Sequence, residues 1–184
     1  MVAIALALFA SSALAAPCGP TESLEAAAHG GWMMPTSRSC LYKVAARKHS
    51  RHQAHASRLL LADAQARSDM WTWKSLAESH VQLVPEDGDV WMQLVVHTQR
   101  HEHPQDVVRV TNAALDLADA WAMPHDDARV VTMHRLRTYA AIRARAGRGL
   151  DDEVVSYAKE WLAAAQDQAP AVAWELAGES PPGT

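Results

Sequence analysis

Histidines are the residues of this chain whose type and spacing most directly suggest chemistry. The 184 residues include ten of them, and an imidazole can bind a metal ion or exchange a proton near neutral pH. Two groups stand out: His49, His52 and His55, and then His97, His101 and His103. Because His97 and His101 are four residues apart, a helix would place both on one face, where they could share a metal ion.

Neither histidine group completes a metal-binding motif. The metalloprotease pattern H-E-x-x-H begins at His101 but fails at its last position, which is Gln105. A zinc site needs three or four ligands in a fixed geometry, and no cysteine lies in either group. We therefore expect solvated surface histidines, no resident metal and no cofactor. A histidine-rich, metal-binding periplasmic protein is the alternative hypothesis.

The common motifs of enzymes are also missing. The sequence contains no G-x-S-x-G, no G-x-x-x-x-G-K-[ST] and no G-x-G-x-x-G. His125 and His134 have Asp126 and Asp127 near them in the sequence, but no nucleophile is indicated beside them. We therefore expect a protein without catalytic activity.

Positive charge is concentrated in two stretches, although the whole chain is acidic, with 17 Lys and Arg against 21 Asp and Glu. Residues 38–58 and residues 129–148 each contain six basic side chains and no acidic one. Such stretches either bind an anionic partner or form solvated faces balanced by acidic turns, here at residues 86–89 and 151–153. We favour solvated faces, and the net charge of −4 argues against a nucleic-acid partner.

The first residues resemble an export signal. Residues 2–16 form an uncharged apolar run that is short for a bilayer span, and Ala13-Leu14-Ala15 fits the A-x-A pattern of a cleavage site. The usual preceding basic residues are missing, since the first Lys or Arg is Arg38. We expect cleavage of residues 1–15, a periplasmic or secreted protein, and an N-terminal arm over residues 16–38. A retained anchor or apolar first helix is the alternative, and only such an uncleaved signal would contact a membrane.

Export would allow the two cysteines to form a disulfide. Cys18 and Cys40 are the only cysteines, and they enclose a loop of 40 − 18 = 22 residues. In an oxidising compartment this bond would tie the arm to the first helix and stabilise the fold by about 3 kcal/mol in the chain-entropy model. In a reducing compartment they would be two unrelated thiols.

The body of the chain has the apolar spacing of helices. Apolar residues recur three and four positions apart, and the alternation typical of strands is absent. Helices are predicted at about residues 40–51, 54–66, 69–83, 90–100, 104–117, 127–146 and 152–168, with a frayed tail over 178–184. Ser39 is predicted to cap the first helix, and Ser68 or Asp69 the third. Pro104 suits a first helical turn.

Tryptophans should mostly lie in the core between these helices, because their large side chains bury much apolar area. Trp71 and Trp73 are two residues apart and cannot share a helix face. We therefore expect one of the two to be exposed.

Residues 34 positions apart match along the middle of the chain. The pairs include Ser57 and Trp91, Leu60 and Leu94, Ala64 and Thr98, Trp73 and Val107, and Ala77 and Thr111. In addition, Pro85 closes one segment six residues before Trp91-Met92-Gln93-Leu94 opens the next. These features resemble the tetratricopeptide-repeat family, whose unit is a helix pair of about 34 residues with a W-x-x-L opening and a terminal proline. An irregular helical bundle with a chance offset is the alternative.

The resemblance covers residues 54–119 and implies an all-α fold. Antiparallel helix pairs would stack as a short right-handed solenoid within a helical domain over residues 39–177. In this family the first helix of each pair lines a concave face that binds polypeptide, and the matching positions here are His55, Arg58, Gln65, Met92, Val96, Gln99, Arg100, His134 and Thr138. Trp73 and His80 depart from the pattern at crossing positions that usually carry small residues. We therefore predict an exported, non-catalytic interaction module that binds a protein or peptide in this groove.

Overall fold

A computed structural model describes residues 35–48, 51–118, 121, 128–146, 148 and 151–182. Within these ranges all regular structure is helical, so the predicted all-α class is confirmed for this part of the chain. The helices are α2 (Pro35–Ala45), α3 (Gln53–Ala66), α4 (Met70–Leu83), α5 (Gly88–His101), α6 (Pro104–Leu115), α7 (Ala128–Ala144), α8 (Asp152–Ala165), the short 3-10 helix η2 (Gln166–Gln168) and α9 (Ala171–Ala177). They fall into two compact units, and the boundary between the units in the chain lies between Arg67 and Ser68.

The first unit contains α2 and α3, which pack against each other. Helix α2 begins at Pro35, so the prediction that Ser39 caps it is wrong. Proline suits a first helical turn because it has no amide hydrogen to leave unpaired. The helix also ends earlier than expected, at Ala45, whose carbonyl accepts a hydrogen bond of 2.8 Å from the side-chain Nε2 of Gln53.

A buried carboxylate joins the two helices of this unit. Asp63 of α3 accepts two hydrogen bonds from the Arg38 guanidinium of α2, at 2.6 and 3.0 Å, and a third from Arg67 at 3.0 Å. The bond from Arg38 lowers the pKa of Asp63 below its ordinary value, and the Arg67 bond adds to this against the opposing effect of burial. The ionised form of Asp63 therefore stabilises the packing of α2 on α3.

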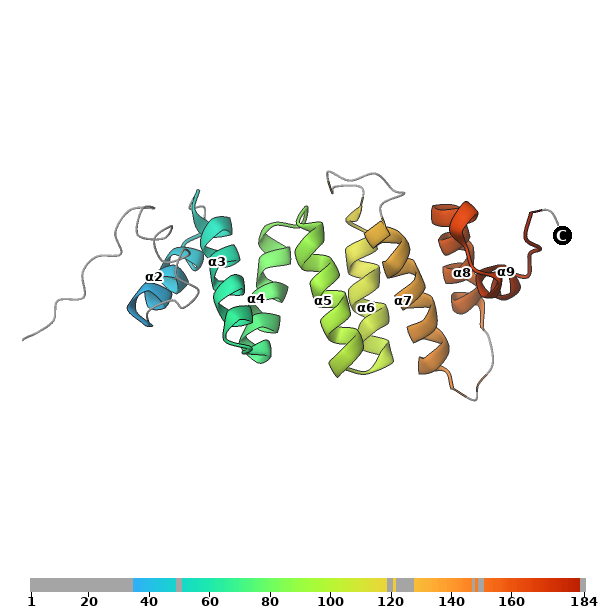
Figure 1. The fold of residues 1–184 in the computed structure, drawn as a ribbon, viewed down its shortest axis with the longest axis horizontal. Helices are drawn as coiled ribbons and strands as arrows, with labels where there is room; N and C mark the ends of the chain where they lie inside the picture. The colour runs from blue at the N-terminus through green and yellow to red at the C-terminus, as the bar shows by residue number, and fades with distance from the viewer. Residues whose placement is uncertain are drawn as a thin grey trace, which may run out of the picture. The chain divides into compact units, whose positions relative to one another are not determined.

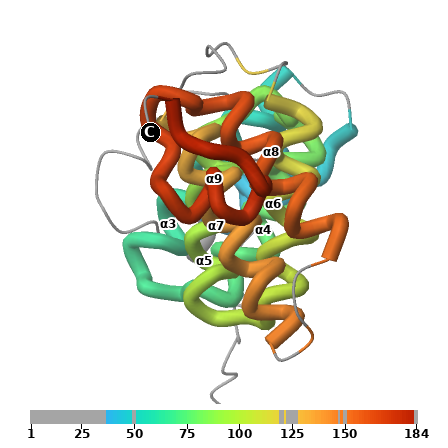
Figure 2. The backbone as a smooth tube through the Cα atoms, turned by 90° about the vertical axis from the view of Figure 1, so that its right-hand side faces the viewer, coloured from blue at the N-terminus to red at the C-terminus, as the bar shows by residue number. Residues whose placement is uncertain are grey.

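In the second unit each helix packs mainly on its neighbours in the chain. The contacts run from α4 to α5, and so on to α9, and α5 also contacts α7 (Figure 1). Helices α8 and α9 form the C-terminal end of this unit, which faces the viewer in Figure 2. Chain-neighbour packing is compatible with a helical-repeat protein, because each helix pair needs the next to cover its apolar face.

Side-chain caps fix the starts of three helices in this unit. Asp69 accepts a hydrogen bond from the Thr72 amide, and Asp151 accepts one from the Val154 amide. Asp87 plays the same role for α5, and α6 begins at Pro104 as predicted. A carboxylate at these positions pairs an amide that the helix leaves free and interacts favourably with the helix dipole.

The turn between α4 and α5 is held by two tryptophans. The indole N–H groups of Trp91 and Trp121 both donate to the Pro85 carbonyl oxygen, each at 3.1 Å. In the same turn the ring of His80, which is buried, lies 2.9 Å from the carboxylate of Asp87. The predicted end of one helix and start of the next at residues 85–89 is therefore confirmed.

Burial follows the 34-residue offset found in the sequence. Leu60 and Leu94 are both buried, as are Ala64 and Thr98, and Ala77 and Thr111. Trp73 is buried like Val107, its counterpart in α6. Positions 34 residues apart are therefore buried alike, which is what a repeat requires.

Gly88 is the residue of this turn at which a side chain does not fit. An added Cβ would lie 3.2 Å from Cε3 of Trp121, and that ring is fixed by its bond to Pro85. We predict that Gly88→Ala lowers the free energy of unfolding by about 1 kcal/mol, because this overpacking exceeds the helix-propensity gain of alanine. Urea unfolding would measure it, with the exposed Gln93→Ala as the control. An unchanged midpoint for Gly88→Ala would contradict this packing.

We predict that the first unit loses stability in acid, because Asp63 becomes protonated there. The pKa of Asp63 is lower in the folded unit than in the unfolded chain, where it is about 3.9. Ionised Asp63 therefore stabilises the unit at pH values above about 3.9, and this contribution is lost as the pH falls through the folded pKa. We expect Asp63→Asn to destabilise α2 and α3 by about 2 kcal/mol near pH 7 and to flatten their dependence on pH below 5. Hydrogen exchange of the α3 amides would show both effects, and Lys43→Gln on the exposed side of α2 should show neither.

Candidate functional site

A groove lies on the surface of the second unit between α4 and α6. Its volume is about 620 Å³, and α5 supplies its floor. The lining residues are Glu78, Val81, Gln82, Pro85, Trp91, Leu94, Arg109, Val110, Ala113 and Leu117. We call this hollow the α4–α6 groove.

The floor of the α4–α6 groove is apolar and its rim is polar. Trp91 and Leu94 are buried below it. Glu78 stands on the α4 side and Arg109 on the α6 side. Both charges already have partners, since Glu78 lies 3.6 Å from Lys74 and Arg109 lies 3.4 Å from Asp106. The groove can therefore take an apolar surface without leaving a charge unpaired.

A second hollow of about 310 Å³ lies between the start of α4 and the end of α5. Met70, Trp71, Lys74, His97, His101 and Glu102 line it, and we call it the Trp71 hollow. The Trp71 side chain is 86% exposed, whereas Trp73 is only 3% exposed. The prediction that one of these two tryptophans is exposed is confirmed.

Ionic contacts and burial set the charges within the Trp71 hollow. The Lys74 ammonium lies 2.5 Å from the Glu102 carboxylate, and this contact raises the pKa of Lys74. The rings of His97 and His101 lie side by side, with centroids 4.7 Å apart. Burial lowers the pKa of His97, and the neighbouring His101 adds to this effect. His97 is therefore held in its neutral form, in which imidazole nitrogen can accept a proton or bind a metal.

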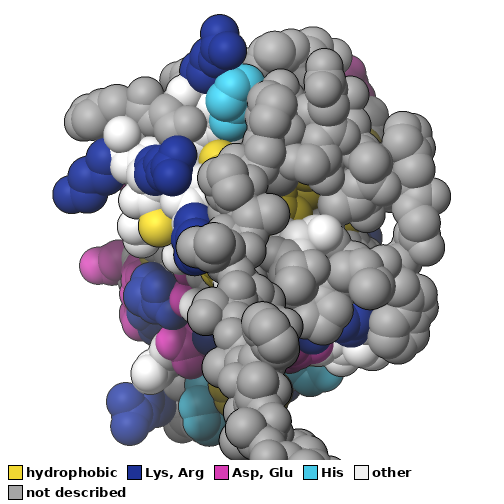
Figure 3. Space-filling model, turned by 90° about the vertical axis from the view of Figure 1, so that its left-hand side faces the viewer, with side chains coloured by type: hydrophobic (Ala, Val, Ile, Leu, Met, Phe, Trp, Pro, Cys, Tyr) yellow, Lys and Arg dark blue, Asp and Glu magenta, His cyan; other side chains and the backbone are white. Residues whose placement is uncertain are grey.

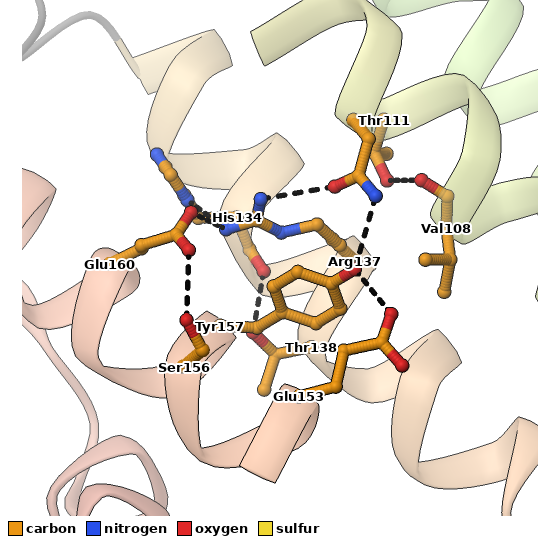
Figure 4. Close-up of polar contacts among 10 residues, drawn as sticks. Val108, Thr111, His134, Arg137, Thr138, Glu153, Ser156, Tyr157 and Glu160 are labelled. Atoms are coloured by element: carbon orange, nitrogen blue, oxygen red, sulfur yellow. Dashed lines mark hydrogen bonds and ion pairs between the residues drawn. The ribbon is translucent and has the colours of Figure 1, made fainter. Parts of the chain in front are cut away.

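The densest polar cluster of the second unit surrounds a buried arginine (Figure 4). Arg137 of α7 is 4% exposed. It donates to the side-chain oxygen Oδ1 of Asn112 at 3.1 Å and to the Glu160 carboxylate at 2.8 Å, and it lies 3.0 Å from a ring nitrogen of His134. Its guanidinium carbon lies 4.2 Å from the centre of the Tyr157 ring, which adds a cation–π contact.

These groups are occupied by one another, and Glu153 also lines a separate hollow of about 420 Å³ between α6, the end of α7 and the start of α8. The Tyr157 hydroxyl donates to Glu153 at 2.6 Å and accepts from Asn112 at 3.1 Å. Arg137 lines neither the α4–α6 groove nor the Trp71 hollow, and its Nε atom is buried without a hydrogen-bond partner. The cluster therefore holds α6, α7 and α8 together.

Arg137 was not singled out in the sequence analysis, which counted it among six arginines of one basic stretch. The spacing of Arg137 relative to the apolar residues of the same helix could have identified it as buried. Three buried apolar residues of α7 lie three or four positions from it, Met133, Ala140 and Ala141, and buried Val130 lies seven positions before it. An arginine on the apolar face of a helix needs buried partners, because an unpaired charge there is very unfavourable.

The residues predicted to bind a partner have different surroundings. His55, Arg58 and Gln65 are exposed on α3, and Gln99 and Arg100 are exposed on α5. Half-buried positions are found for Met92, Val96 and His134. Thr138 is fully buried, and its hydroxyl donates to the His134 carbonyl at 2.9 Å, so its predicted contact with a partner is wrong. None of these residues lines the α4–α6 groove or the Trp71 hollow.

The two basic stretches are partly balanced, as the sequence analysis favoured. Arg129 pairs with Asp89 at 2.5 Å, and Arg145 pairs with both Asp151 and Glu153. The acidic turns predicted to balance residues 129–148 therefore do so. In residues 38–58 the exposed bases are Lys43, Arg47, Lys48, Arg51 and Arg58. Lys and Arg side chains gather on one flank of the end face seen in Figure 3.

The histidines are less uniformly solvated than predicted. His80 is buried against Asp87, and His97 is half-buried with its ring centre 5.5 Å from that of Trp73. Across the described residues no three His, Cys, Asp or Glu side chains gather as metal ligands. A site built from nitrogen and carboxylate ligands alone is therefore not found there.

Several predictions fall outside the described residues. They are the signal over residues 1–15, most of the arm over residues 16–38, Cys18 and hence its disulfide with Cys40, and His125, Asp126 and Asp127. Among the described helices, none combines the length and the apolar character needed to cross a bilayer. The export signal and the disulfide stay predictions.

Comparison with known proteins leaves the family of this chain open. No protein-family model matches it, and no curated protein or solved structure is significantly similar to it. What can be said about function therefore comes from the chain's own surfaces.

The Arg137 cluster predicts a sharp difference between two substitutions. Arg137→Ala should lower the free energy of unfolding by about 3 kcal/mol, because it leaves a cavity and removes a buried interaction partner of Asn112 and Tyr157. Glu160→Gln should have an effect below about 1 kcal/mol, because that side chain is 48% exposed and solvent screens its charge. Urea unfolding would separate them, with the exposed Arg135→Ala as the control. Equal effects would show that the cluster does not depend on buried Arg137.

Proposed function

We propose that this chain is an exported, non-catalytic helical-repeat module that binds a protein partner. Its helix pairs would be antiparallel and stacked as a right-handed solenoid resembling tetratricopeptide repeats. Support comes from the 34-residue pattern of burial and from packing between successive helices. The apolar run over residues 2–16 and its A-x-A pattern support export.

The observation that carries the proposal is the α4–α6 groove. A hollow of about 620 Å³ with helical walls and an apolar floor is the arrangement that receives an amphipathic helix. Such a helix would lay its apolar face over Trp91 and Leu94, in the way that helices of this unit already cover one another.

Charge on the two rims favours one class of partner helix. The pairs of Glu78 with Lys74 and of Arg109 with Asp106 are solvent-screened and weak. Glu78 on the α4 side can therefore still attract basic side chains, and Arg109 on the α6 side acidic ones. A partner helix with a basic flank and an acidic flank on either side of its apolar face therefore fits in a single direction. This differs from the predicted groove on the α5 face, where Gln99 and Arg100 are exposed.

Photo-crosslinking in the producing cells would locate the partner-binding surface. The photoreactive residue benzoylphenylalanine would replace Gln82 or Ala113, which stand at the surface on opposite sides of the α4–α6 groove. We expect both to capture the same protein. Gln99 tests the predicted α5 face, and Lys159 on α8 is the control, since both are exposed elsewhere. Capture from Gln99 alone would show that the partner binds the α5 face and not the groove. No capture at any position would contradict the proposal of an interaction module.

Blocking the groove should then weaken binding of the captured partner. Ala113→Arg adds a long charged side chain to an exposed position of the α6 wall. We expect affinity to fall by at least about 10-fold, as for loss of a central interface contact. Gln93→Arg on the exposed side of α5 should leave affinity unchanged. Calorimetry would measure both variants after circular dichroism has shown that each is folded.

A further inference from the structure

We propose that Met70, His97 and His101 of the Trp71 hollow bind a soft monovalent metal ion of the Cu(I) type. This site goes beyond the proposed partner groove and does not depend on it. It uses the three side chains of the hollow that carry metal-ligating atoms and lack an ion-pair partner within it.

The two imidazoles supply the first pair of ligands. His97 and His101 lie one helical turn apart at the end of α5, with ring centroids 4.7 Å apart. His97 is half-buried and His101 is exposed, and both line the Trp71 hollow. The two rings can therefore supply two nitrogen ligands from one face of α5.

The third ligand decides the kind of metal. The hollow contains one carboxylate, Glu102, and it is engaged by Lys74 at 2.5 Å. The remaining candidate is the thioether sulfur of Met70. Thioethers select Cu(I) and related soft ions and bind Zn²⁺ poorly. Because Cu(I) accepts a low coordination number, two imidazoles and one thioether suffice, whereas a zinc site wants four ligands.

The electrostatics of the hollow tolerate one added positive charge. The carboxylates of Glu102 and Glu78 both lie near Lys74 and neutralise its ammonium group. The carbonyl end of the α5 dipole also lies at His101, in the last turn of the helix, and this end favours a cation. A monovalent ion suits this balance better than a divalent one.

Trp71 adds a contact and a local signal. Its indole is the most exposed large apolar side chain of the described residues, and it lines the same hollow as the proposed ligands. The face of an indole attracts cations. A metal ion bound at Met70, His97 and His101 would therefore lie beside Trp71 and change its fluorescence.

The test is a titration of the full chain with Ag(I), which has the ligand preferences of Cu(I) without its redox chemistry. The chain contains seven tryptophans and seven methionines, so the readout must be local. Subtracting the titration of the Trp71→Phe variant isolates the signal of Trp71. We expect a one-to-one, saturable change in that difference signal.

Ligand variants decide the outcome. His97→Ala, His101→Ala and Met70→Leu should each weaken the Ag(I)-dependent change by at least about 10-fold. The control is His103→Ala, because His103 is exposed near the hollow without lining it. The proposal is overturned if the Trp71 signal does not respond, if it responds equally in the ligand variants, or if Zn²⁺ produces it more tightly than Ag(I) regardless of Met70.

Discussion

The Pro85 carbonyl is the acceptor on which the centre of the second unit depends. It lies in the turn after α4, and it accepts one indole N–H from Trp91 of α5 and one from Trp121, which follows α6. A carbonyl oxygen has two lone pairs, so both bonds form without competition. The two indoles need this acceptor because an unpaired N–H in the core is costly. Pro85 and Trp91 also line the α4–α6 groove, so the same interaction that joins three helices shapes the proposed binding surface.

Packing between chain neighbours explains why the surface features lie where they do. Each helix of the second unit is covered mainly by the next, and the space between α4 and α6 is floored by α5 alone. Apolar residues face this space near Pro85, which gives a groove suited to a helix. At the other end of α4 the lining changes to His97, His101 and Trp71, which gives a hollow suited to an ion. The two sites share α4 and α5 but differ in chemistry, and different residues report on each of them.

The Arg137 cluster shows how functional residue types can serve structure. An arginine, a tyrosine, a histidine and two glutamates gather there, as they would in many active sites. Their donors and acceptors are directed at one another across α6, α7 and α8. Burial of Arg137 among these partners keeps its charge paired, and the cluster works as a polar tie between helices.

The sequence by itself determined the helices, because apolar spacing, capping aspartates and Pro104 act over a few residues. It also determined the 34-residue register, whose partners such as Leu60 and Leu94 are buried alike. Only the tertiary structure decided which faces stay open. Thr138 is buried and Trp71 exposed because the packing of neighbouring helices, rather than local spacing, sets what covers each side chain. Likewise, Met70 lines the same hollow as His97 and His101, and Arg137 donates to Glu160, although these residues come from different helices. The pattern along one helix does not show which residues of another helix lie beside it.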